Sequence, residues 1–205
     1  MLNSSLIKPK KEDTLKIKKY AAIDIGSNAM RLLITYIVEQ EGKESQFNKN
    51  SLVRVPIRLG QDSFTVGEIS EENIDRMIDA MKAFRLLMKV HKVEKYKALA
   101  TSAMREAYNG KEVVEIIKEK AGIDIEIIDG KKEAIIIAST DLHHLLKSDK
   151  TYLYVDVGGG STEFSLFDNG KIVVSKSFKA GTVRFLNKMV CDVVWEEMEK
   201  WIKTN

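Results

Sequence analysis

The segment at residues 154–171, YVDVGGGSTEFSLFDNGK, repeats the pattern of an earlier segment at residues 20–37, YAAIDIGSNAMRLLITYI. Each contains an apolar residue, Asp, an apolar residue, Gly, two small residues and then a second apolar run. This order is typical of a strand, a tight turn and a second strand. The two aspartates, Asp24 and Asp156, lie 132 positions apart (156 minus 24), and the pattern around them indicates an internal duplication.

The repeat lies in a chain whose composition fits a folded globular protein. The 205 residues are 44% hydrophobic and 31% charged, enough for a core and for one domain or two small ones. The net charge of +3 is small for a nucleic-acid-binding protein, so no nucleic acid duplex is expected as a partner. Cys191 is the single cysteine, which favours a cytoplasmic location. No apolar run suits a membrane span or a signal peptide, so no membrane partner is expected.

Around the first loop the sequence predicts an antiparallel meander. Residues 1–18 are rich in lysine, and we interpret them as a flexible extension. Apolar runs predict strands at 20–25, 31–38 and 51–59, the last with Pro56 at an edge or bulge. Further elements are then expected in alternation: a helix after the N-cap Ser70 with a methionine-rich core face, a strand at 96–103, a helix at 111–122 and a strand at 123–129.

The same order of elements restarts after a helix predicted from residue 131 to about 146. Three strands are expected at 151–157, 162–168 and 171–178, with a turn at Asn169-Gly170, followed by a helix from about 182 to 202. We therefore predict an α/β architecture with two similar domains around a cleft. The first domain covers 19–129, and the second, at 130–205, is predicted to be incomplete because it lacks the later strands of the first.

Both Asp-containing loops have the chemistry of an anion-binding site. Successive backbone N–H groups in a tight turn form a concave set of donors, and glycines permit close approach and positive φ. The phosphate-binding candidates are Gly26, Ser27 and Asn28 in the first loop and Gly158, Gly159, Gly160, Ser161 and Thr162 in the second. Asp24 and Asp156 would repel a phosphate, so Mg²⁺ or water is expected between them. A plain glycine-rich hairpin would explain either loop alone, but two matched copies predict a polyphosphate group held from both sides.

Five segments carry a resemblance to a known family. They are AAIDIGSNAMRLLI, ALATSAMREA, IIDGKKEA, YVDVGGGSTEFSL and KAGTVRF, which together span residues 20 to about 185. In this order they resemble the Ppx/GppA family of exopolyphosphatases and guanosine pentaphosphate phosphatases, within the acetate kinase–hsp70–actin superfamily. The resemblance implies the actin-like ATPase (ribonuclease H-like) fold, with the two repeated loops as its phosphate-binding loops.

The resemblance also implies roles for individual residues. Glu133, in the position of the last Glu of the family's Gly-x-Glu-Glu-Ala motif, would activate the attacking water. Arg105 would grip phosphate through its guanidinium group. Asp24, Asp156 and Glu163 would hold Mg²⁺ or another divalent cation as the cofactor. Without the motif, Glu133 would simply be an acid at a helix start, and Arg105 a surface residue.

Two positions depart from the family pattern. Lys132 replaces the first Glu of the Glu-Glu pair, and Ala29 replaces a serine of the first loop. The predicted function is a phosphohydrolase that releases terminal phosphate from inorganic polyphosphate, guanosine pentaphosphate or both. The alternative is a truncated phosphate- or nucleotide-binding module with little turnover. A kinase of the same superfamily would need an adenosine-binding segment, which this sequence does not contain.

Two further expectations concern assembly and movement. The incomplete second domain would expose an apolar face, so a homodimer that covers this face is expected. A hinge is predicted near Asp129-Gly130. Closure about it would bring Arg105 and Glu133 toward the loop at Gly158.

Overall fold

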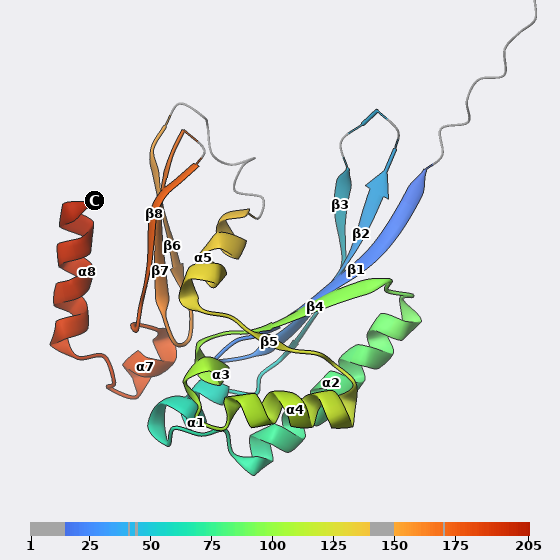
Figure 1. Ribbon diagram of the computed structural model, residues 1–205, viewed down its shortest axis with the longest axis horizontal. Coiled ribbons are helices and arrows are strands. Elements are labelled where there is room, and N and C mark those ends of the chain that lie inside the picture. The colour runs from blue at the N-terminus through green and yellow to red at the C-terminus, as the bar shows by residue number, and fades with distance from the viewer. Residues whose placement is uncertain (1–14, 41, 44, 140–149, 170) are drawn as a thin grey trace, which may run out of the picture.

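The computed structural model describes residues 15–40, 42–43, 45–139, 150–169 and 171–205 (Figure 1). We call residues 16–127 the first half and residues 130–204 the second half. Within the described residues the first half contains a five-stranded sheet and the second half a three-stranded sheet. Most of the predicted extension at 1–18 and the end of the predicted helix at 131–146 lie outside the described residues. The prediction of a flexible extension is wrong for residues 16–18, which begin the first strand of the sheet.

The sheet of the first half has the strand order β3-β2-β1-β4-β5. The strands β1 (Lys16–Ile25), β2 (Met30–Glu39) and β3 (Gln46–Val55) form the predicted antiparallel meander. After a crossover through α2 (Glu71–Val90), β4 (Lys95–Ala100) pairs with β1 in parallel. A helical crossover is the usual connection between parallel strands. The remaining elements of this half are α1 (Leu59–Thr65), α3 (Ser102–Glu106), α4 (Gly110–Ala121) and β5 (Glu126–Ile127).

The second half repeats the meander with the strand order β6-β7-β8. The strands are β6 (Tyr152–Val157), β7 (Thr162–Asp168) and β8 (Lys171–Phe178), all antiparallel. In Figure 1, α5 (Gly130–Ser139) lies on the side of this sheet that faces the first half, and α8 (Asp192–Thr204) lies on the opposite side. The short helix α7 (Thr182–Leu186) connects β8 to α8. The duplicated meander inferred from the sequence is therefore present.

Two apolar clusters hold these layers together. The larger one includes Met77, Met81 and Phe84 of α2, packed with β-strand residues such as Ile23 and Leu32, all at most 2% exposed. The predicted methionine-rich stripe is thus core. The smaller cluster joins α8 to the second sheet through Phe164, Phe178, Ala180 and Met198, with Trp201 packed against it.

Three predicted strands end earlier than the sequence pattern indicated. The third strand ends at Val55 rather than 59, because Pro56 lacks an N–H and Arg58 has a left-handed φ of 63°. Leu59 then starts α1, which the sequence pattern did not predict. The predicted strand at 96–103 ends at Ala100 and is followed by α3, and the predicted strand at 123–129 is reduced to the two residues of β5.

The predicted final helix is two helices. The chain leaves α7 at Leu186, Lys188 takes a left-handed φ of 54°, and Cys191 is extended before α8 begins. Non-glycine residues seldom adopt positive φ, and such a residue interrupts a helix. The break lets the start of α7 contact the β6–β7 loop, while α8 lies along the sheet of the second half (Figure 1).

Candidate active site

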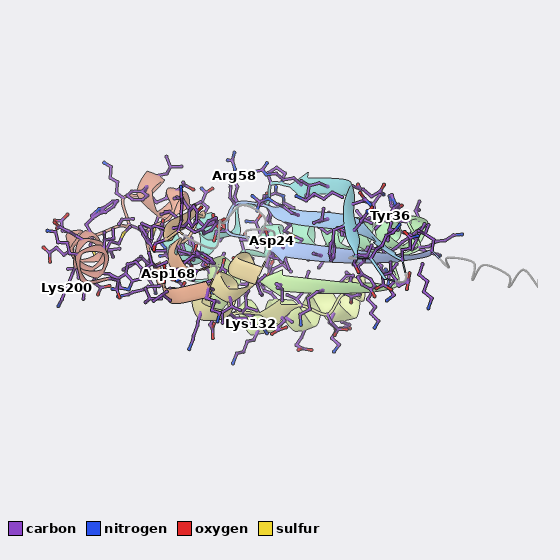
Figure 2. The ribbon with its side chains drawn as sticks, turned by 90° about the horizontal axis from the view of Figure 1, so that it is seen from above. Asp24, Tyr36, Arg58, Lys132, Asp168 and Lys200 are labelled. Atoms are coloured by element: carbon purple, nitrogen blue, oxygen red, sulfur yellow. The ribbon has the colours of Figure 1, made fainter. Side chains whose placement is uncertain are left out.

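A cleft of about 470 Å³ separates the end of the first sheet from the β6–β7 loop and the start of α5. Figure 2 places Asp24 near the middle of the long axis of the molecule, while Tyr36 and Lys200 lie toward opposite ends. The predicted site residues that line the cleft are Asp24, Gly26, Ser27, Asn28, Glu133, Asp156, Gly158, Gly159, Gly160, Ser161 and Glu163. Arg105 and Thr162 are not among its lining residues. The repeated loops are therefore brought together, as the sequence analysis expected.

The second loop packs directly onto the first half. A Cβ added to Gly160 would lie 2.3 Å from Ser102 Oγ and 2.5 Å from the Phe64 ring, and one added to Gly159 would lie 3.1 Å from Ser27 Cβ. Glycine is thus required by close approach. None of the glycines 158–160 lies in the left-handed region, so of the two properties that glycine permits, this loop uses close approach and not positive φ.

Hydrogen bonds within the first loop and from α1 hold the first loop in place. The Gly26 N–H donates to the Ala29 carbonyl at 3.1 Å, and the Ser27 carbonyl accepts from the Gly60 N–H at 2.7 Å. The Ser27 hydroxyl, 4% exposed, lies 2.9 Å from the Ser102 hydroxyl at the start of α3. Gly60 is the second residue of α1, so the unpredicted helix α1 supports this loop.

The second loop is held by the N-terminus of α7. The Gly158 and Gly159 carbonyls accept hydrogen bonds from the N–H groups of Thr182 and Val183 at 3.0 and 2.8 Å. The Thr162 hydroxyl donates to the Ala180 carbonyl. The side chain of Thr162 is therefore used within the fold, which explains why this predicted donor does not line the cleft.

The backbone donors of both loops remain available. Among the described residues, no acceptor takes a hydrogen bond from the N–H groups of Ser27, Asn28, Gly159 or Gly160. All four residues line the cleft. Neighbouring unpaired N–H groups in a turn attract anions, and a pair of such turns suits a ligand with several phosphate groups.

Glu133 is the most perturbed carboxyl of the cleft. It stands in the first turn of α5, and its side chain is 18% exposed. Its Oε2 atom accepts no hydrogen bond from the described residues. Burial, reinforced by the negative charge of Glu163, raises the pKa of Glu133 to about 7, although the positive charge of Arg105 opposes this shift. A carboxyl with such a pKa can exchange a proton near neutral pH.

Arg105 contacts Glu133 rather than the open cleft. Its Nη1 atom donates to the Ile128 carbonyl at 2.6 Å and lies 3.6 Å from Glu133 Oε2. In this structure Arg105 is therefore the ion-pair partner of Glu133, and with a side chain only 27% exposed it is not the surface residue of the alternative interpretation.

Three further acids stand around the cleft. Asp24 Oδ2 accepts a hydrogen bond from Arg31 at 2.9 Å. Burial raises the pKa of Asp24, Arg31 lowers it in part, and the charge of Asp156 raises it further. Asp156 and Glu163 are paired across β6 and β7, and Ser177 Oγ donates to Glu163 Oε1 at 2.7 Å. Gly130 lies against Ser177, since an added Cβ would be 3.0 Å from the Ser177 Cβ. This contact sets the start of α5 beside Glu163.

These acids do not form an all-protein metal site. In the part of the chain that the structure describes, no group of three or more His, Cys, Asp or Glu side chains could hold a metal ion. Mg²⁺, however, is commonly bound by one or two carboxylates together with phosphate oxygens. Asp24 and Asp156 fit that kind of site, in which the ligand completes the coordination.

Sequence reasoning missed several residues of the cleft. Arg31, Lys97, Thr101, Ser102 and Thr182 also line it. Thr101 and Ser102 directly follow β4, and the carboxyl ends of parallel strands often carry binding residues, a signal that could have identified them. Arg31 and Lys97 project from strand positions, which no local motif marks.

The fold and the cleft together define a class of protein. Two β-meanders that face each other through Asp-containing loops form the actin-like fold. The chain belongs to the Ppx/GppA phosphatase family, whose sequence pattern matches residues 38–202. No helix among the described residues is long and apolar enough to cross a membrane.

Similar proteins agree with this assignment. The chain is 32% identical over 197 residues to a bifunctional 3-dehydroquinate synthase/phosphatase of Fusobacterium nucleatum, covering 90% of this chain and 30% of that protein. It is 31% identical over 173 residues to a guanosine-5'-triphosphate,3'-diphosphate pyrophosphatase of Photobacterium profundum, covering 84% and 34%. The crystal structure of an exopolyphosphatase from Cytophaga hutchinsonii superposes with a TM-score of 0.74 at 31% identity, covering 83% and 53%. The chain thus spans about half, or less, of the length of these relatives.

Proposed function

We propose that this protein is a phosphohydrolase that releases terminal phosphate from inorganic polyphosphate, guanosine pentaphosphate or both. The observation that carries the proposal is Glu133, a largely buried carboxyl with a pKa of about 7. Its Oε2 accepts no hydrogen bond from the described residues, and it lies in a cleft lined by loop residues with available backbone amides. The relatives named above include proteins described as an exopolyphosphatase and as a guanosine-5'-triphosphate,3'-diphosphate pyrophosphatase, which supports both substrates.

In the proposed mechanism the two loops bind the terminal phosphate groups through their amides. Ionised Glu133 orients a water molecule and accepts its proton as the water oxygen attacks the terminal phosphorus. The bond from that phosphorus to the bridging oxygen breaks, so the products are orthophosphate and a chain shortened by one phosphate. Arg105 holds Glu133 in place through their ion pair.

The proposed cofactor is Mg²⁺ held by Asp24 and Asp156, with Glu163 nearby. When bound, it would neutralise charge on the phosphate oxygens. We also propose that the two halves act as separate domains that close about Asp129-Gly130, as the position of the cleft between them suggests.

A second candidate function is phosphate or nucleotide binding with little turnover. It is favoured by the placement of Arg105, which pairs with Glu133 and does not line the cleft. Both candidates predict phosphate binding, and only the first predicts that Glu133 is needed for product release.

The experiment measures phosphate release with Mg²⁺ from long-chain polyphosphate and from guanosine pentaphosphate. Wild type is compared with Glu133→Gln and with Glu112→Gln, a matched control because Glu112 is an exposed acid in the first turn of α4. Release that is lost in Glu133→Gln, with phosphate binding retained, supports the hydrolase. Equal release by Glu133→Gln and wild type would overturn the role of Glu133, and binding without release by wild type would favour the second candidate.

We further propose that a second copy of the chain covers the outer edge of β6. Among the described residues β6 has no neighbour on that edge, whereas the corresponding edge of β1 is paired with β4. Val155 on β6 is 44% exposed, but Ile23, 132 positions earlier on β1, is 2% exposed. Among the other edge strands of the described residues, β3 and β8 carry lysines, which discourage pairing, and β5 is only two residues long, whereas β6 has six residues and no lysine.

A further inference from the structure

We propose that Arg184 is a positioning residue that holds the second phosphate-binding loop against the first half of the protein. Arg184 lies on α7, which belongs to the second half. The inference rests on the proposed function, because it assigns Arg184 a part in binding the phosphate groups of that substrate. It concerns a residue that does not line the cleft.

The guanidinium of Arg184 connects three separate elements. Its Nε atom donates to the Gly160 carbonyl at 2.6 Å. Its Nη2 atom lies 2.7 Å from both carboxylate oxygens of Glu106, at the end of α3. Its central carbon lies over the ring of Phe64 of α1, 3.8 Å from the ring centre. One side chain therefore links the loop to two helices of the first half.

These contacts are strong because they are shielded from water. The side chain of Arg184 is 8% exposed and that of Glu106 is 23% exposed. Charge-assisted hydrogen bonds of a guanidinium gain strength where water is excluded, and removal of one partner leaves the other charge poorly compensated. Lys179 also reaches Glu106, at 3.3 Å, but it is 70% exposed and does not contact the loop. Lys179 thus provides a matched comparison on the same carboxylate.

The contact with Gly160 bears directly on phosphate binding. The Gly160 carbonyl and the Ser161 N–H belong to one planar peptide group, so fixing the carbonyl also fixes the orientation of that N–H. The same residue packs against Ser102 and Phe64 with no room for a side chain. Arg184 therefore sets both the direction of a loop amide and the distance between the two phosphate-binding loops.

Glu106 ties this arrangement to the catalytic base. It directly follows Arg105 in α3, and Arg105 pairs with Glu133. Anchoring Glu106 fixes the end of the short helix that presents Arg105. Loss of Arg184 should thus weaken phosphate binding and also disturb the orientation of Glu133.

The test compares Arg184→Ala, Arg184→Lys and Lys179→Ala in the full chain. Calorimetry measures the Kd of tripolyphosphate, steady-state phosphate release gives KM and kcat, and thermal unfolding checks the fold. For Arg184→Ala we expect Kd and KM to rise about tenfold or more, as loss of a charged hydrogen bond commonly produces. Arg184→Lys should give an intermediate rise, since one ammonium cannot serve both the Gly160 carbonyl and Glu106. Lys179→Ala should match wild type.

A merely structural role would give a different pattern. It would lower the unfolding temperature and the active fraction but leave Kd and KM unchanged. Unchanged Kd and KM in a folded Arg184→Ala variant would therefore overturn the proposal. If Arg184→Ala fails to fold, unchanged Kd and KM in Arg184→Lys overturn it instead. The binding measurement does not need turnover. A wild type that binds tripolyphosphate but releases no phosphate from long-chain polyphosphate or guanosine pentaphosphate would therefore refute the hydrolase while still testing Arg184.

Discussion

Arg105 Nη1 lies 3.6 Å from Glu133 Oε2, close enough for an ion pair but longer than a hydrogen bond. The same oxygen accepts no hydrogen bond from the described residues. Glu133 therefore keeps an acceptor atom for another partner, while the nearby positive charge prevents its pKa from rising still further. A water molecule between Glu133 and a bound phosphate would complete this arrangement, and it is the proposed nucleophile.

The raised pKa of Glu133 predicts the pH dependence of turnover. The base must be ionised to accept a proton, so kcat/KM should increase with pH and level off above about pH 7. A pH–rate profile with saturating Mg²⁺ tests this expectation. A profile that is flat between about pH 5 and 8 would contradict the assignment of Glu133 as the base.

The same pKa predicts a stability gain in Glu133→Gln. The native pKa of about 7 exceeds the ordinary value of 4.5, so the native state holds the proton more tightly and loses stability as pH rises between these values. Glutamine never ionises, and the variant should be more stable than wild type at about pH 8 by on the order of 2–3 kcal/mol, with a smaller gain at about pH 5. Urea unfolding at both pH values measures the difference. Glu112→Gln, the exposed control, should show no such dependence of stability on pH. An equal gain in stability at both pH values for Glu133→Gln would contradict the raised native pKa of Glu133.

Much of this site was predictable because its information is local. The spacing of Asp24 and Asp156 located both loops, and the residues between strands identified most of the cleft. The contacts that hold the loops in place, in contrast, join residues that are far apart in the sequence. Arg184 and Glu106 are 78 positions apart, and nothing in either segment indicates that they meet. The apolar residues around Leu59 suit a strand as well as a helix start, so α1 could not be distinguished by pattern.

Gly160→Ala should force the two phosphate-binding loops apart. Its methyl group would lie 2.3 Å from Ser102 Oγ and 2.5 Å from Phe64, and overpacking of this kind typically costs about 1–3 kcal/mol. We expect lower stability together with weaker tripolyphosphate binding, measured by urea unfolding and calorimetry. Gly158→Ala is the comparison, since its Cβ would lie 3.2 Å from the Ser161 carbonyl oxygen and needs only a small shift. Equal stability of the two variants would show that the close packing around Gly160 does not exclude a side chain at this position.

Removal of one acid from the proposed Mg²⁺ site should increase the Mg²⁺ requirement. Asp156 lines the cleft, and its charge also raises the pKa of Asp24. Asp156→Asn should therefore need about tenfold more Mg²⁺ for half-maximal phosphate release, a typical effect of altering a metal site. Calorimetric titration of Mg²⁺ in the presence of pyrophosphate gives a second readout without turnover. Asp124→Asn is the control, since Asp124 pairs with Lys118 outside the cleft, and equal Mg²⁺ affinity of Asp156→Asn and wild type would rule out Asp156 as a ligand.

The uncovered edge of β6 predicts self-association. Two copies can pair their β6 strands antiparallel about a two-fold axis, which pairs the backbone groups along the two edges. The pairing also places Leu153, Val155 and Val157, each at least 44% exposed in one chain, beside the same residues of the second copy on one face of a continuous sheet. An aspartate at the centre of this stripe would face the same charge on the second copy, so Val155→Asp should convert a dimer into a monomer in size-exclusion chromatography with light scattering. Leu86→Asp, which changes an exposed leucine on α2, should leave the dimer intact. A wild-type chain that stays monomeric at high concentration, or a Val155→Asp variant that stays dimeric, would show that a second copy does not cover this edge.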